Sequence, residues 1–324
     1  MASFSWKRAI RVNILILKFM GLSPKGNEGY TFNIYAIFTT AVLLLVNSHI
    51  IFQTVNVYFV SDLTELSAII FILFTEWLTS LKMYYFIRNT RILKKLMLDV
   101  ESEDFQPTNE EQINAVQVTV GMWKTIYFAY YVPALITLVL WTVFPLVDGT
   151  FRQYRLPFSV WYPYNIKKSP TYEITYFYQT MSFWAIAIAG FNMDTMIAAL
   201  MMLSEAQCDI LCENLKNLPC SGYNEKFKLC INHHKKILRF SKGCNDFFNE
   251  LSLGQFFVSV ASLAVAMFQL TLVEPTSGEC FSILFYLGSI TTEIFLYCWF
   301  GNELELKVGP WCLHKRIIFQ LLFK

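Results

Sequence analysis

The chain has 324 residues, of which 55% are hydrophobic, 17% are aromatic and only 15% are charged, and its mean hydropathy is +0.41. A soluble domain carries about 25% charged residues, so this composition excludes an ordinary soluble globular protein. The formal net charge of +2 gives no indication of nucleic-acid binding. We therefore expect an integral membrane protein.

Residues 1–29 place basic side chains among apolar ones, in the sequence WKRAIRVNILILKFMGL. Lys18 interrupts the apolar run and no small-residue cleavage site follows, so a cleaved signal peptide is not expected. The pattern predicts an amphipathic segment that lies on the inner leaflet of the membrane.

Six apolar runs follow within residues 30–300, each close to the ~20 residues with which a helix crosses a ~30 Å hydrocarbon core. None alternates with the period of two that a transmembrane barrel strand shows. The predicted fold is therefore an all-α integral membrane helical bundle. Its six expected transmembrane helices are Tyr30 to Phe52, Leu66 to Ile87, Ile126 to Val147, Tyr178 to Leu203, Leu251 to Val273 and Cys280 to Phe300.

Lys and Arg are distributed unevenly between the two sides of this bundle. Twenty of the 26 lie in the N-terminal segment, the second loop, the fourth loop and the tail. The opposite side has only four, all in the third loop: Arg152, Arg155, Lys167 and Lys168. Because cytoplasmic loops carry the excess of positive charge, we predict a cytoplasmic N-terminus.

The third loop, residues 148–177, is the only sizeable outer connection, and it contains the sequence RLPFSVWYPYNIKKSPTYE. Its three prolines restrict the backbone, and its aromatic side chains supply rigid apolar area. We predict a folded lid rather than a flexible connector.

The long inner loop, residues 204–250, keeps apolar residues at helical spacing on both of its arms. This predicts long cytoplasmic extensions of the fourth and fifth helices, and we expect the apolar stripe of the second arm to form a helical bundle between subunits. Five of the eight cysteines lie here beside His233 and His234, but no C-x2-C pair is present. We therefore expect reduced thiols rather than a zinc site, and no cofactor.

Four ionisable residues fall inside the apolar runs: Glu76, Lys82, Asp194 and Glu293. Such residues indicate an ion path or a proton relay, although internal polar packing is an equally good interpretation of Asp194 and Glu293. Glu76 and Lys82 are six positions apart, about 240° around a helix, so they are not expected to pair. Lys82 lies one turn from the cytoplasmic end, and we expect it to snorkel to the interface.

The outer halves of the helices offer aromatic and small side chains without charge. A cavity for a small apolar ligand needs such walls and one or two hydroxyls, although ordinary aromatic packing produces the same pattern. The candidate pocket residues are Phe71, Phe74, Ala134, Thr137, Trp141, Tyr178, Met181, Ala185 and Phe285. The sequence has no G-x-S-x-G, H-E-x-x-H, Walker A or glycine-rich dinucleotide motif, so we do not expect an enzyme.

Several motifs occur in the same order as in a known family. They are FMGLSP, the lid sequence LPFSVWYPY with SPTYE, FNMDTM leading into AQCDILCENLKNL, HHKKILRFSK and FLYCWFGNEL, and together they cover most of Phe19 to Leu304. With the cytoplasmic N-terminus, this chain resembles the insect odorant receptors. The resemblance implies a cation channel gated by small volatile odorants in the plasma membrane of olfactory neurons. It also implies a tetramer, formed with a shared co-receptor subunit through a cytoplasmic anchor, and an odorant site in the outer half of each subunit.

The tail, residues 301–324, departs from the family pattern. Family members have a seventh helix that lines the ion pore, whereas the last apolar stretch here, Ile317 to Phe323, is too short to span a membrane. We therefore expect a chain truncated before that helix, with a tail that begins a helix at Pro310 on the inner leaflet. The alternatives are a non-conducting remnant or splice form, a gustatory-type receptor, and a membrane transporter.

Overall fold

The computed structural model describes residues 4–24, 33–147, 149–218 and 222–308, and in these ranges the chain is helical with no strand. The expected tail helix and the truncation concern residues 309–324, which lie outside the described residues. The elements in chain order are α1 (Trp6–Ala9), α2 (Arg11–Phe19), α3 (Ile34–Val57), α4 (Leu63–Arg88), α5 (Thr90–Val100), η1 (Glu103–Phe105), α6 (Glu110–Val147), η2 (Thr150–Gln153), α7 (Thr171–Lys216), α8 (Tyr223–Leu272) and α9 (Gly278–Val308).

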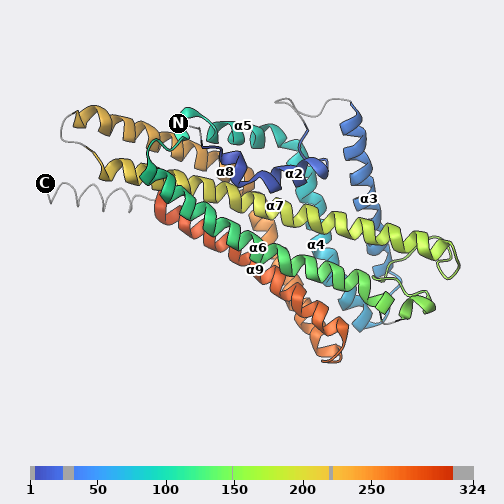
Figure 1. Cartoon of the computed structure of the whole chain (residues 1–324). Coiled ribbons are helices and arrows are strands. Elements are labelled where there is room, and N and C mark those ends of the chain that lie inside the picture. Colours follow the sequence, from blue (N-terminus) through green and yellow to red (C-terminus); the bar gives the residue numbers. More distant parts are fainter. Residues whose placement is uncertain (1–3, 25–32, 148, 219–221, 309–324) are drawn as a thin grey trace.

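Six of these helices, α3, α4, α6, α7, α8 and α9, are long and apolar enough to cross a membrane. The predicted all-α membrane bundle with six transmembrane helices is therefore confirmed within the described residues. The main difference concerns the third span, because α6 begins at Glu110, well before the apolar run itself. In Figure 1, α6 and α9 run side by side along the front of the bundle, and α3 stands at its edge.

Side-chain caps mark where several of these helices begin. Asn33 accepts a hydrogen bond from the backbone N–H of Ala36 (2.9 Å), and Asp62 accepts one from the N–H of Glu65 (3.1 Å). A short polar side chain of this kind satisfies one of the four free N–H groups at a helix N-terminus. These two caps thus define where α3 and α4 start, and Asn33 lies three residues inside the predicted span Tyr30 to Phe52.

α7 is the central helix of the bundle. It packs against α2, α3, α4, α6, α8 and α9, and every residue from Asn192 to Cys208 is buried. A helix that is buried around its whole circumference is enclosed by other helices, and small residues such as Ala198 and Ala199 allow close packing there. This central position brings α7 side chains into contact with most other elements.

Two helices extend far beyond the thickness of a membrane. The 46 residues of α7 and the 50 of α8 correspond to roughly 69 and 75 Å at 1.5 Å per residue. The buried stripe of the α8 extension, which includes Ile237, Phe240 and Cys244, packs on α5 and α7 of the same chain. Leu229 and Leu238 of this extension remain exposed, and its part in a bundle between subunits stays a prediction.

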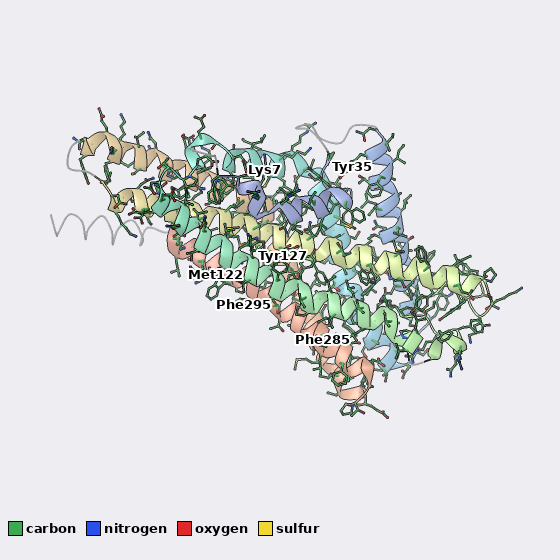
Figure 2. The ribbon with its side chains drawn as sticks, viewed as in Figure 1. Lys7, Tyr35, Met122, Tyr127, Phe285 and Phe295 are labelled. Atoms are coloured by element: carbon green, nitrogen blue, oxygen red, sulfur yellow. The ribbon has the colours of Figure 1, made fainter. Side chains whose placement is uncertain are left out.

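The N-terminal segment is docked on the bundle. Asn13 of α2 donates a hydrogen bond to Thr195 Oγ1 of α7 (2.8 Å), and Asn192 of α7 donates one to the backbone oxygen of Asn13 (3.1 Å). The opposite face of α2 exposes apolar side chains that include Leu15 and Phe19. Figure 2 shows α2 between Lys7 and Tyr35, whose hydroxyl donates to the backbone oxygen of Lys18 (3.0 Å).

Candidate ligand-binding site

The lid is a folded segment held against the bundle. The side chain of Gln179, fully buried on α7, accepts a hydrogen bond from the backbone N–H of Phe158 and donates one to its backbone oxygen, both at 3.1 Å. Tyr172 of α7 donates to the backbone oxygen of Arg155 (2.7 Å). α7 begins at Thr171, so the last seven residues of the predicted lid, 148–177, belong to that helix instead.

Beneath the lid lies a cavity of about 580 Å³, called the outer cavity here. Its apolar walls come from the lid and from α4, α6 and α9, and they include Phe71, Trp141 and Phe158. Acidic side chains of Asp62, Glu65 and Glu279 also contribute to it. The outer cavity is therefore wide, mixed in polarity and directly covered by lid residues.

A second cavity of about 90 Å³, called the inner cavity here, lies among α4, α6, α7, α8 and α9. Its aromatic walls are Tyr130, Trp141, Phe183, Phe191 and Tyr286, and small residues such as Ala134, Thr137 and Gly190 complete them. The inner cavity thus combines aromatic walls with hydroxyl, amide and charged side chains, which include Lys82, Asp194 and Glu293. Apolar walls with polar groups placed among them are the composition of a site for a small organic ligand.

Trp141 belongs to the walls of both cavities. Its ring contacts Phe158 of the lid, Phe183 of α7 and Tyr286 of α9, with ring centroids 5.6, 5.4 and 5.6 Å apart. The contacts with Phe158 and Phe183 are edge-to-face and the contact with Tyr286 is tilted. Aromatic pairs at such distances contribute about 0.5–1.5 kcal/mol each beyond area burial. The indole thus joins the lid, two helices and both cavities.

The structure brings some of the predicted pocket residues together and separates others. Ala134, Thr137 and Trp141 line the inner cavity, and Phe71 lines the outer one. Tyr178 is hydrogen-bonded to Ser48 of α3 (2.5 Å), and Ala185 is partly buried against the bundle core. The remaining three have exposed side chains that line neither cavity: Phe74 (40% exposed), Met181 (47%) and Phe285 (37%), the last labelled on α9 in Figure 2.

Sequence reasoning missed several cavity residues, notably Phe158, Phe183 and Tyr286. Tyr286 directly follows Phe285, and its hydroxyl donates to the backbone oxygen of Phe71 (2.9 Å). Adjacent residues of a helix point about 100° apart. A prediction that is wrong by one position therefore selects a side chain on the outer surface in place of the one that lines the cavity. The sequence shows the aromatic pair Phe285 and Tyr286, but it does not show how α9 is rotated about its own axis.

At the other end of the inner cavity, three of the four predicted intramembrane ionisable residues meet. Lys82 donates hydrogen bonds to Asp194 of α7 and to Gln255 of α8, and its Nζ lies 3.7 Å from Oε1 of Glu293 on α9. Tyr297 also donates to Asp194 (2.7 Å). We refer to these five residues as the polar cluster.

The expectation that Lys82 snorkels to the interface is wrong. Its side chain is only 2% exposed, and its ammonium is paired within the bundle. Removing a charge from water costs several kcal/mol unless the charge is paired and hydrogen-bonded. Asp194 of α7, which lies 112 positions further along the chain, supplies that pairing. Partners at this sequence separation are not visible in the local pattern.

Glu76, the fourth ionisable residue, lies outside this cluster. Its Oε1 is 3.5 Å from Nε2 of His49 on α3, and both side chains are buried. As expected from their helical separation, Glu76 and Lys82 do not pair. Glu76 therefore serves as a buried carboxylate that lines neither cavity.

An all-helical bundle whose described residues include six membrane-spanning helices defines this chain as a multi-pass membrane protein. The family model described as 7tm Odorant receptor matches residues 62–309. The chain belongs to the odorant receptor family, and it is a receptor rather than an enzyme. The predicted family is thus confirmed.

Curated relatives and solved structures agree with this assignment. The Odorant receptor Or1 of Anopheles gambiae is 24% identical, over 91% of this chain and 78% of that protein. The Odorant receptor 82a of Drosophila melanogaster is 20% identical, over 76% and 68%. The olfactory receptor OR5 of Machilis hrabei has the same fold, with a TM-score of 0.80 at 17% identity over 93% of this chain and 80% of that one. Its complex with eugenol gives a TM-score of 0.81 at 17% identity, over 93% and 82%.

Proposed function

We propose that this chain is the odorant-binding subunit of an odorant-gated cation channel in the plasma membrane of an olfactory neuron. In this proposal it assembles with a shared co-receptor subunit, as a tetramer, and binds small volatile apolar ligands. Membership of the odorant receptor family supports the proposal. The eugenol complex of a receptor with the same fold gives an example of such a ligand.

The observation that carries the proposal is the inner cavity, which shares Trp141 with the outer cavity. It offers aromatic walls, the hydroxyl of Thr137 and a charged end within the membrane-spanning part of the bundle. A small odorant needs apolar contact area and a few polar groups that fix its orientation. Ala134, Thr137 and Trp141 are accordingly our first candidates for ligand contacts, while Phe71 belongs to the route beneath the lid.

The proposed orientation places the N-terminus and the α7 and α8 extensions in the cytoplasm. The concentration of Lys and Arg at that end supports it. So does α2, whose exposed Val12, Leu15 and Phe19 suit the acyl region of an inner leaflet and whose Arg11 and Lys18 suit its anionic headgroups.

The test is expression of the chain in cells with and without the co-receptor subunit, followed by recording of odorant-evoked cation currents. We expect surface-expressed protein to give currents only in the presence of the co-receptor. Uptake of a substrate without current would indicate a transporter instead. A surface-expressed complex that stays silent to a broad odorant panel would contradict the proposal and favour a non-conducting form.

A further inference from the structure

The outer cavity has room for a ligand of its own. Its volume of about 580 Å³ falls within the range of about 300–1,000 Å³ that is usual for ligand pockets, whereas the inner cavity measures about 90 Å³. Lid residues 155–160 line it together with residues of α3, α4, α6, α8 and α9. The chemistry of these walls indicates which class of ligand fits.

The charged side chains that line the outer cavity are mostly acidic. Asp62 caps α4, Glu65 lies in the first turn of α4, and Glu279 lies in the first turn of α9. Among the described lining residues, only Arg155 of the lid is basic. All four side chains are exposed, and none forms an ion pair with another described residue. The excess of carboxylates therefore attracts cations to this cavity.

Two hydroxyls in the wall offer a ligand acceptors rather than donors. Ser159 of the lid donates its proton to Glu65 and accepts a hydrogen bond from Nδ2 of Asn56 on α3 (3.2 Å). Ser282 of α9 donates to the backbone oxygen of Gly278 (2.8 Å). Each hydroxyl has a single proton, and both protons are thus already used within the protein.

Gln53 of α3 adds a buried acceptor to the same wall. Its side chain is 1% exposed, and its Oε1 has no hydrogen-bond partner among the described residues. A buried acceptor without a donor is costly, and the cost is recovered when a donor reaches it. Because Gln53 lines the outer cavity, a ligand there can supply that donor.

Aromatic rings form the apolar part of the outer cavity. Phe71 of α4, Trp141 of α6 and Phe158 of the lid all line it, and the rings of Trp141 and Phe158 pack with centroids 5.6 Å apart. The face of an aromatic ring attracts a cation, most strongly for Trp, and it also packs well against an alkyl chain. These walls therefore suit an organic cation better than an inorganic one.

We propose that the outer cavity is a second ligand site, which binds protonated primary amines. The ammonium donates a hydrogen bond to Oε1 of Gln53 and is attracted by the carboxylates of Glu65 and Glu279, while the alkyl chain lies against Phe71 and Trp141. A neutral alcohol lacks the charge, and a quaternary ammonium lacks the N–H donors. This site is separate from the proposed odorant site in the inner cavity and does not depend on channel function.

Three probes with equal numbers of heavy atoms separate charge from hydrogen bonding: hexylamine, which is protonated at neutral pH, propyltrimethylammonium and 1-hexanol. Binding is measured by calorimetry on the purified full-length chain in nanodiscs of a zwitterionic lipid, without the co-receptor. We expect the wild-type protein to bind hexylammonium about tenfold more tightly than either other probe, since hydrogen bonds that involve a charged group are the strong ones. Raising the salt concentration should weaken binding of both cations but not of the alcohol.

Two substitutions test the two parts of the proposal. Gln53→Leu removes the buried acceptor, so we expect hexylammonium to bind about tenfold more weakly and the quaternary ammonium to bind as before. Glu279→Gln removes one exposed charge, so both cations should bind about threefold more weakly, and the alcohol should be unaffected. Glu274→Gln is the matched control, because Glu274 is an exposed carboxylate near the start of α9 that lines neither cavity.

Equal affinity of the wild-type protein for all three probes would overturn the proposal. So would hexylammonium binding that neither Gln53→Leu nor Glu279→Gln weakens, since the amine would then bind elsewhere. If Gln53→Leu does not fold, the exposed Glu279→Gln variant and the salt dependence still decide the outcome. Because binding is measured without the co-receptor, absent odorant-evoked currents would contradict the proposed function and leave this result unchanged.

Discussion

Trp141, which the sequence analysis proposes as a ligand contact, lines both cavities in the structure. The sequence offered an indole in the outer half of the third span, and the structure surrounds it with Phe158, Phe183 and Tyr286 on three other segments. Because the same side chain lines both cavities, it separates the space under the lid from the space inside the bundle. Its removal is expected to join the two.

We predict that Trp141→Ala raises the half-maximal concentration of odorants at least tenfold and changes their order of potency. Trp141 is partly buried, and the loss of its ring removes aromatic contact area from the walls of both cavities. The measurement is a set of dose–response curves in cells with the co-receptor, at matched surface expression. Trp299→Ala, on the partly exposed side of α9, is the control. Unchanged curves across a broad panel would remove Trp141 from the ligand site.

The ionisable residues show the limit of residue-scale prediction. Lys82 was expected at the interface because it lies near one end of its helix, but the partners that hold it inside belong to α7, α8 and α9. The hydropathy around a residue and its position along a helix give information about that helix only, and not about the helices that pack against it. The partners of a buried charge are decided by how separate helices pack.

At the scale of elements, the lid and α7 act as one unit. Gln179 satisfies both backbone groups of Phe158, and Phe158 in turn packs on Phe183, one helical turn further along α7, with ring centroids 4.2 Å apart. The prolines and aromatics of the lid predicted a folded segment, and these contacts show what holds it. Nothing in the sequence around Gln179 indicated that its side chain would hold the lid.

Gln179→Ala is predicted to loosen the lid without unfolding the bundle. The substitution leaves two buried backbone groups without partners, at a cost of about 1–3 kcal/mol each. We expect trypsin to cleave the purified protein several-fold faster at the exposed lid residues Arg155 and Lys167. Gln153→Ala, in the exposed η2 turn, is the matched control and should leave the cleavage rate unchanged. Equal rates for both variants would show that the hydrogen bonds of Gln179 do not hold the lid in place.

At the scale of the whole molecule, the α8 extension is part of the folded subunit and gives it a pH response. His233, outside the membrane-spanning part of α8, packs on Phe105 and lies 3.4 Å from Oε1 of Gln207. Burial lowers the pKa of His233 from its ordinary 6.5 to about 4. Between these two values the unfolded chain binds a proton that the folded chain does not, so the free energy of unfolding falls as the pH falls from about 6.5 to about 4.

We predict that His233→Gln makes the thermal stability of the purified protein less dependent on pH in this window. The expected difference between wild type and variant is of the order of 1–3 kcal/mol on passing from pH 7 to pH 4.5, measured by thermal unfolding in one detergent. His234→Gln, at the neighbouring and less deeply buried position, should change the profile less. Parallel profiles for the wild type and His233→Gln would contradict the burial of a neutral imidazole.

The sequence by itself determined the number and approximate limits of the spans, because a run of about 20 apolar residues is a local property that only a membrane helix satisfies. It also determined the lid as a folded segment and the family, through motifs that occur in order along the chain.

Only the tertiary structure decided which side chains line the cavities and which charges pair. Tyr286 rather than Phe285 borders the inner cavity because rotation about the axis of α9 is set by packing against its neighbours. Lys82, Asp194 and Glu293 meet because three separate helices converge at one depth. Periodicity fixes the angle between residues of one helix, but the orientation of one helix toward another depends on contacts between distant parts of the chain.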